Sequence, residues 1–116
     1  MEDILKRLRN ETPGVTAVAL VSNDGLIISS FLAENIESEK VAAIAAALIN
    51  QGETSSGDAM MGEMSQVTIR GADGFIVITR ADAESLLTVF TNTQAKLGMV
   101  LYDITVAMKE LKMHVN

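Results

Sequence analysis

The chain has 116 residues, a net charge of −6 and no cysteine, and 48% of its residues are apolar. A chain of this length forms one domain with a substantial core, and with only 3% aromatic residues that core must be aliphatic. The missing cysteines exclude disulfides, thiolate nucleophiles and Cys-ligated metals. The acidic balance argues against nucleic-acid binding, which needs clustered Lys and Arg.

The N-terminal sequence, MEDILKRLRNE, is charged and amphipathic, unlike a signal peptide. No apolar run approaches the roughly 18 residues that cross a bilayer. No stretch is repeated, low in complexity or linker-like. We therefore expect one domain over residues 1–116, located in the cytoplasm and without an integral membrane segment.

The chain begins with a helix and a hairpin. Residues 2–9 show helical spacing of apolar groups, and Pro13-Gly14 ends that helix. Residues 15–22 are apolar on both faces, which predicts a central strand covered on both sides. An Asn-Asp-Gly turn follows, and the chain returns through residues 26–31 as a second strand.

The longest expected element is a helix from Ser38, as its N-cap, to Met61, with Gly62 at the C′ position. Two strips of small or apolar side chains line it at about 100° per residue. The strip expected to dock on the sheet contains Val41, Ile44, Leu48, Gly52, Ser55 and Ala59. The neighbouring strip contains Ala42, Ala45, Ala46, Ile49, Ser56 and Met60. So wide an arc indicates either a close-packed interface or simply the high helix propensity of Ala.

Three strands and a helix complete the chain. Residues 64–70 alternate, with one polar face, as an edge strand does, and a hairpin turn leads to a strand at residues 75–79 that is apolar on both faces. Residues 86–91 form the fifth strand. The last helix, capped by Asn92 or Thr93, has 3–4 spacing of Leu97, Val100, Leu101, Ile104, Met108 and Leu111.

Central strands that are buried on both faces need helices on both sides. We therefore predict an α/β (α+β) fold in the order helix, two strands, helix, three strands, helix. A five-stranded antiparallel sheet would carry the long helix on one face and the two terminal helices on the other.

No pattern indicates an active site. The one histidine, His114, lies near the C-terminus, where a solvated side chain is expected. Gly52 to Asp58 has the glycine spacing of a P-loop, but Asp58 stands where the phosphate-binding Lys is needed. The carboxylate pairs are local and solvated: Glu37/Glu39, Glu53/Asp58 and Asp82/Glu84. We predict no catalytic, cofactor-binding or metal-binding residues, and therefore not an enzyme.

Four motifs follow one another along the chain: PGVxAVxLVSxDGL at residues 13–26, the Ala-rich helix closing in Gly62-Glu63, VxIxGxDGF at residues 67–75, and Leu97-Gly98. Together they resemble the Roadblock family, which includes dynein light chains and MglB-like regulators of Ras-like GTPases. The resemblance covers essentially the whole chain and is strongest to the stand-alone, single-domain prokaryotic branch.

This resemblance implies a profilin-like fold and a homodimer in which the third strands pair across a two-fold axis and the long helices pack side by side. It implies a non-catalytic regulator or scaffold for a Ras-like small GTPase. Activators of this kind reposition the GTPase's own catalytic groups. The alternatives are a structural adaptor whose dimer groove binds a peptide, as in dynein light chains, and, less favoured, a small-ligand sensor.

The expected dimer and partner surface combines the second strip of the long helix with the polar face of the edge strand. Its residues are Ala42, Ala45, Ala46, Ile49, Gly52, Glu53, Ser56, Met60, Met64, Gln66, Thr68 and Arg70. Arg70 is the one arginine on this surface, and we expect no cofactor.

Overall fold

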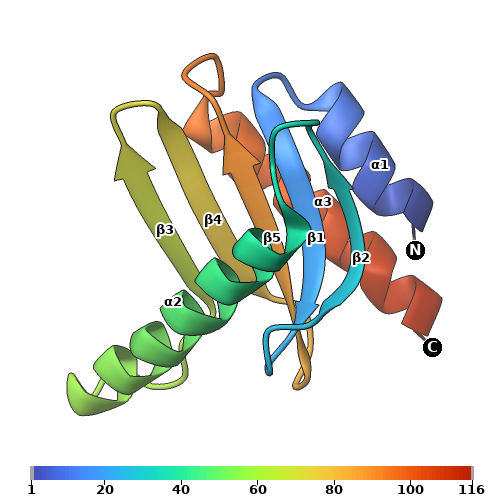
Figure 1. Cartoon of the computed structure of the whole chain (residues 1–116). Helices are drawn as coiled ribbons and strands as arrows, with labels where there is room; N and C mark the ends of the chain where they lie inside the picture. Colours follow the sequence, from blue (N-terminus) through green and yellow to red (C-terminus); the bar gives the residue numbers. More distant parts are fainter. Residues whose placement is uncertain (1, 116) are drawn as a thin grey trace.

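The computed structural model describes residues 2–115, and the side chains of residues 2–113. Its elements are α1 (Glu2–Glu11), β1 (Val15–Ser22), β2 (Ile27–Leu32), α2 (Ser38–Asp58), β3 (Gln66–Gly71), β4 (Gly74–Arg80), β5 (Ser85–Thr91) and α3 (Leu97–Val115) (Figure 1). This is the predicted order. The side chain of His114 lies outside the described residues.

The five strands form one sheet in the order β2-β1-β5-β4-β3, and every neighbouring pair is antiparallel. β5 therefore lies at the centre of the sheet. β3 lies at one edge, as its alternating sequence predicted, and β2 lies at the other edge.

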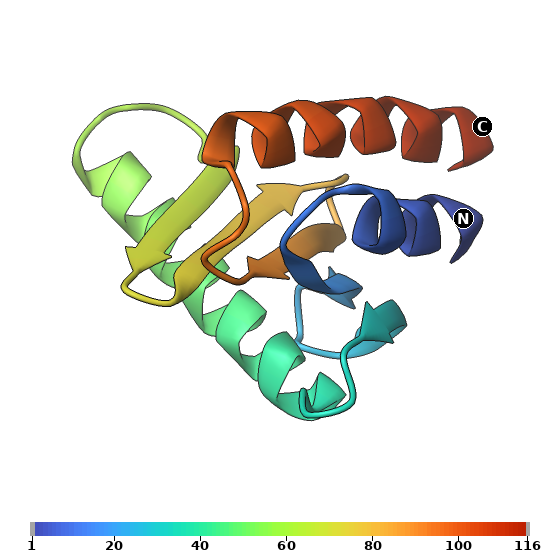
Figure 2. The same cartoon turned by 90° about the horizontal axis from the view of Figure 1, so that it is seen from above.

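Helices cover both faces of this sheet. α1 and α3 lie side by side on one face, and α2 crosses the other face (Figure 2). Alternation along β1 supplies both cores: Val18 and Leu20 belong to the core under α1 and α3, and Ala19 and Val21 belong to the core under α2. The predicted fold class and layer arrangement are confirmed.

The predicted ends of the long helix are wrong. Glu37 is the N-cap and forms no side-chain capping bond, and the helix ends at Asp58. Met60, with φ of 61°, is the C′ residue, and Gly62, which also has a positive φ (87°), lies two residues further on. The N–H of Met61 donates to the carbonyl of Ser56 (2.9 Å), and the N–H of Met60 donates to that of Gly57 (3.0 Å). These are the two bonds of a Schellman motif, in which Gly is the usual C′ residue, so the sequence pointed to the wrong position.

The last helix begins later than predicted. It begins at Leu97, and the Asn92 side chain accepts a hydrogen bond from the backbone N–H of Gln94 (2.9 Å). This is a local turn that keeps the chain outside the helix for several more residues.

Candidate partner-binding surface

The outer edge of β3 has backbone groups that point away from the sheet. The backbone N–H of Arg80 donates to the carbonyl of Ser65 (3.0 Å). In an antiparallel pair every second residue bonds the neighbouring strand, so from Ser65 onward the odd-numbered residues of β3 bond β4. The N–H and C=O groups of Gln66, Thr68 and Arg70 therefore point outward. Within the described part of the chain no strand pairs with this edge. Such an edge is a template for another strand.

The side chains of these three residues lie on the face of the sheet opposite α2. Gln66 donates its Nε2–H to Thr79 Oγ1 (3.2 Å), and Thr68 is exposed. The Arg70 guanidinium lies over the Phe75 ring, 5.1 Å from its centroid. A cation held over an aromatic ring is restrained, so Arg70 contacts its own sheet.

The prediction that Ala42, Ala45 and Ile49 belong to the partner surface is wrong. All three are at most 1% exposed and pack in the core under α2. A helical wheel identifies two adjacent apolar strips but cannot tell which of them faces the sheet. The structure places the first half of the second strip, Ala42, Ala45 and Ile49, inward.

Gly52 also faces inward. A Cβ built on it would lie 2.8 Å from Cγ2 of Val67 and 3.3 Å from Sδ of Met64. Glycine at this position therefore lets α2 cross β3 closely. Gly52 and the half-buried Met64 form the contact between helix and edge strand, and they do not form an outer surface.

The flank of α2 that carries Ala46 and Glu53 contacts the rest of the chain. A Cβ on Gly25 would lie 3.3 Å from the Ala46 methyl group. Arg80 Nη2 donates to Glu53 Oε1 (2.8 Å), and its Nη1 donates to Asn23 Oδ1 (3.0 Å). This flank of α2 therefore contacts the turn between β1 and β2 and, through Arg80, the end of β4.

Two further predicted residues lie at the C-terminal end of α2. Ser56 donates its hydroxyl to the carbonyl of Gly62 (2.7 Å), which holds the loop against the helix. The side chain of Met60 is 90% exposed. The long-helix residues assigned to the partner surface are thus buried or in contact with other parts of the described chain, except Met60, for which the described residues show no such contact.

Sequence reasoning missed the opposite flank of α2. At about 100° per residue, Ile44 and Leu48 lie on the side away from Ala46, next to Gly52 and therefore toward β3. Both are half-buried, and Leu48 packs against the edge of the core under α2. Their apolar character was visible in the sequence, but they were assigned to the core-facing strip.

Beyond α2 the same face of the sheet is open. Figure 1 shows α2 crossing toward one end of β3 and leaving the other ends of β3 and β4 uncovered. There Ile69, Ile76 and Phe90 help to line a groove of about 340 Å³. We call this groove, the flank of Ile44 and Leu48, and the outer edge of β3 together the β3-side surface.

The described residues contain no group of three His, Asp or Glu placed to hold a metal ion. Asp82, in the turn between β4 and β5, has a pKa below its ordinary value, chiefly because its carboxylate accepts the backbone N–H of Glu84. Across residues 2–115 no helix has the length and apolarity to cross a membrane.

The family model of the Roadblock/LC7 domain matches residues 1–91. The chain belongs to the Roadblock/LC7 family. Uncharacterized protein MJ1340 of Methanocaldococcus jannaschii is 30% identical to this Roadblock/LC7 chain over 103 residues, which cover 89% of the chain and 90% of that protein. The resemblance seen in the four motifs is confirmed.

Solved structures agree on the fold. The Roadblock/LC7 domain from Streptomyces avermitilis matches with a TM-score of 0.90 at 20% identity, covering 99% of this chain and 97% of that one. Myxococcus xanthus MglB matches with a TM-score of 0.89 at 23% identity, covering 98% and 93%. Profilin II of Acanthamoeba castellanii has a TM-score of 0.65 at 16% identity and covers 99% and 98%, so the profilin-like prediction holds.

Proposed function

We propose that this Roadblock/LC7 chain is a homodimeric, non-catalytic regulator or scaffold for a Ras-like small GTPase. Family membership and the likeness of its fold to MglB support the GTPase partner. The observation that most supports the dimer is the outer edge of β3, which no described strand pairs with, beside the incompletely buried apolar flank of Ile44 and Leu48 on α2.

In this dimer the β3 strands of two chains pair antiparallel across a two-fold axis, and the sheet continues from one chain into the other. The outward groups of Gln66, Thr68 and Arg70 then gain partners. The second α2 covers Ile44, Leu48 and the groove beside Ile69. An isologous contact of this kind uses each of these residues twice.

The outer face of the two α2 helices is the proposed GTPase-binding surface. Ala43, Ala47, Asn50 and Thr54 are exposed along it. Residues 41–58 contain no Arg or Lys, so α2 brings no arginine finger. Any activating role would therefore consist of repositioning the GTPase's own catalytic groups.

Thr68→Pro tests the dimer. The substitution removes an outward N–H but no bond to β4, and proline is tolerated on edge strands. Thr68→Ala keeps the N–H and is the matched control. We expect wild type and Thr68→Ala to sediment at twice the 12.4 kDa of one chain and Thr68→Pro to sediment at the mass of one, with unchanged circular dichroism. A Thr68→Pro protein that remains a dimer would contradict the strand pairing.

Ala47→Arg tests the GTPase surface. Small GTPases of the source organism, loaded with GDP or a non-hydrolysable GTP analogue, are the binding probes. We expect binding of one loaded form, lost in Ala47→Arg and kept in Lys109→Ala on α3. If no GTPase binds and a long amphipathic peptide is retained in the dimer groove instead, the structural adaptor is the correct function. Gly52→Arg is unsuitable because its side chain would meet Val67.

A further inference from the structure

The outer side of α3 carries large apolar side chains that no part of the described chain covers. Met99, Tyr102, Val106 and Met113 are 50%, 69%, 39% and 79% exposed. Their spacing of three, four and seven residues places them in one row along the helix, with Lys109 between the last two. The opposite side of α3 supplies the core residues Val100, Ile104, Ala107 and Leu111. We call the exposed row the α3 stripe.

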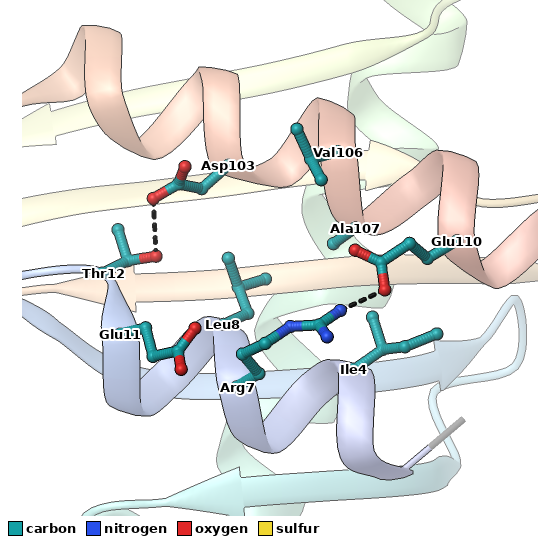
Figure 3. Close-up of a pocket in the computed structure, with 9 residues that line it drawn as sticks. All are labelled: Ile4, Arg7, Leu8, Glu11, Thr12, Asp103, Val106, Ala107 and Glu110. Carbon is teal, nitrogen blue, oxygen red and sulfur yellow. Dashed lines mark hydrogen bonds and ion pairs between the residues drawn. The ribbon is translucent and has the colours of Figure 1, made fainter.

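A groove of about 220 Å³ lies beside this stripe, between α1 and α3 (Figure 3). Its apolar lining comes from Ile4, Leu8, Val106 and Ala107. Val106 belongs to both the groove and the stripe, so the two form one continuous apolar surface. The space is too small for most metabolites, but it accommodates a long side chain.

The rim of the groove is acidic. Glu11, Asp103 and Glu110 line the groove together with a single cation, Arg7, which is paired with Glu110 (Figure 3). The Thr12 hydroxyl donates to Oδ2 of Asp103 (2.8 Å). Among the described residues the Glu11 side chain has no hydrogen-bond or ion-pair partner. Two of the three carboxylates therefore lack a cationic partner.

We propose that the α3 stripe and this groove dock an amphipathic helix of another protein, one whose apolar row is flanked by Lys or Arg on the side that meets the groove, away from Lys109. The apolar row of such a helix would pack on Met99, Tyr102 and Val106, as in other helix-in-groove complexes. The aliphatic stem of a Lys or Arg fits the apolar lining, and its charged end reaches Glu11 and Asp103.

The rim charge distinguishes this occupant from two others. A second copy that paired antiparallel along the stripe would bring the flank of Asp103 and Glu110 against the same flank of its partner, and like charges repel. An anionic membrane is attracted by Lys109 on the stripe, but at the groove it would meet three carboxylates and one cation, Arg7, and be repelled there. A basic helix gains both the apolar contact and the charge attraction.

This surface goes beyond the proposed function and does not depend on it. It lies on the opposite face of the sheet from α2, so an occupied α3 stripe leaves the β3-side surface free (Figure 2).

Two designed helical peptides test the proposal by fluorescence anisotropy with the full chain. Both have the same leucine row; one is flanked by lysines and the other by glutamates. We expect the lysine peptide to bind at least tenfold more tightly at low salt, and we expect higher salt to reduce the difference. Equal affinities would overturn the proposal.

Variants locate the binding site. Tyr102→Glu and Val106→Glu should each weaken the lysine peptide at least tenfold, and Glu11→Gln should weaken it about threefold. Ala47→Glu, on the exposed face of α2, adds the same charge as the first two and should change affinity less than twofold. An equal loss in Ala47→Glu would show non-specific attraction and overturn the site.

Two further measurements test whether an anionic membrane or a second copy of the chain occupies the α3 stripe instead. Wild type should not co-sediment with phosphatidylserine vesicles, and Val106→Glu should keep the sedimentation mass of wild type. Vesicle binding that Tyr102→Glu abolishes would identify a lipid surface. A lower mass for Val106→Glu would identify a second copy. Either result would replace the basic helix as the occupant.

Discussion

The two halves of α2 are held to the protein in different ways. In residues 38–49, Val41, Ala42, Ala45 and Ile49 are fully buried, whereas no residue between 50 and 58 is. The second half runs past the edge of the sheet (Figure 1). It is held by a few specific contacts: Gly52 against Val67 and Met64, Glu53 with Arg80, and Ser56 with Gly62.

The first half of α2 therefore contributes most of the stability that α2 provides, and the second half contributes little. The first half supplies the apolar area that docks α2, so substitutions there change the free energy of unfolding. The second half combines weak helix formers with contacts at single points, so substitutions there produce small effects of either sign. Unfolding should be compared at one protein concentration, because the stability of a dimer depends on concentration.

The largest expected effect is that of Ile49→Ala. It removes a side chain that is 0% exposed and leaves a cavity between α2 and the sheet. We expect the free energy of unfolding to fall by about 2–5 kcal/mol. The exposed neighbour provides the control: Asn50→Ala should change it by less than about 0.5 kcal/mol. Urea titrations of both variants measure the difference, and equal midpoints would show that the first half is not the docking half.

Gly52 and Gly57 provide a matched pair within the second half. A Cβ at Gly57 has nothing within 4 Å, so Gly57→Ala should raise stability by about 0.5–1 kcal/mol through helix propensity. At Gly52 the same gain is opposed by overpacking against Val67, which costs about 1–3 kcal/mol. We expect Gly52→Ala to lower stability by about 1 kcal/mol. If both variants are stabilised to the same extent, the crossing of α2 and β3 is looser than the structure shows.

Met60→Gly should act at the end of the same half. A left-handed non-glycine residue costs about 1–2 kcal/mol, and added freedom of the unfolded chain offsets part of the gain. We expect a net stabilisation of about 0.5 kcal/mol in thermal or urea unfolding. Met61→Gly, one residue later, removes a similar side chain without relieving that strain and should not stabilise. A stabilised Met61→Gly would show that side-chain exposure, not backbone strain, is responsible.

The sequence predicted the element order, the layers and the edge strand because each depends on a local period: alternation in the strands and 3–4 spacing in the helices. The interface residues were harder to predict because Ala, Ile and Leu continue around α2 on both sides of Gly52. Which flank is core depends on how α2 crosses the sheet. That crossing depends on Gly52 meeting Val67, a contact between distant segments. The end of α2 was missed because Met60 occupies a position where glycine is usual.

The smallest expected effect is electrostatic and concerns Asp82 in the turn between β4 and β5. Arg80, the ion-pair partner of Glu53, donates a hydrogen bond to this turn. Arg80 donates to the carbonyl of Asp82, and the pKa of the Asp82 carboxyl is lowered chiefly by the backbone N–H of Glu84. A lowered pKa means that the charged carboxylate stabilises the folded state at neutral pH. That contribution is lost as the pH falls below the ordinary range of aspartate, about 4, toward the folded pKa.

Asp82→Asn keeps the acceptor oxygen and removes the charge, so wild type should be the more stable protein at pH 7. The gap between their urea midpoints should narrow as the pH approaches 3. Asp24→Asn, in the exposed turn between β1 and β2, provides the baseline for loss of one negative charge. A gap that stays constant between pH 7 and pH 3 would mean that Asp82 acts through turn geometry alone. The contact of α2 with Arg80, through Glu53, would then not depend on the charge of Asp82.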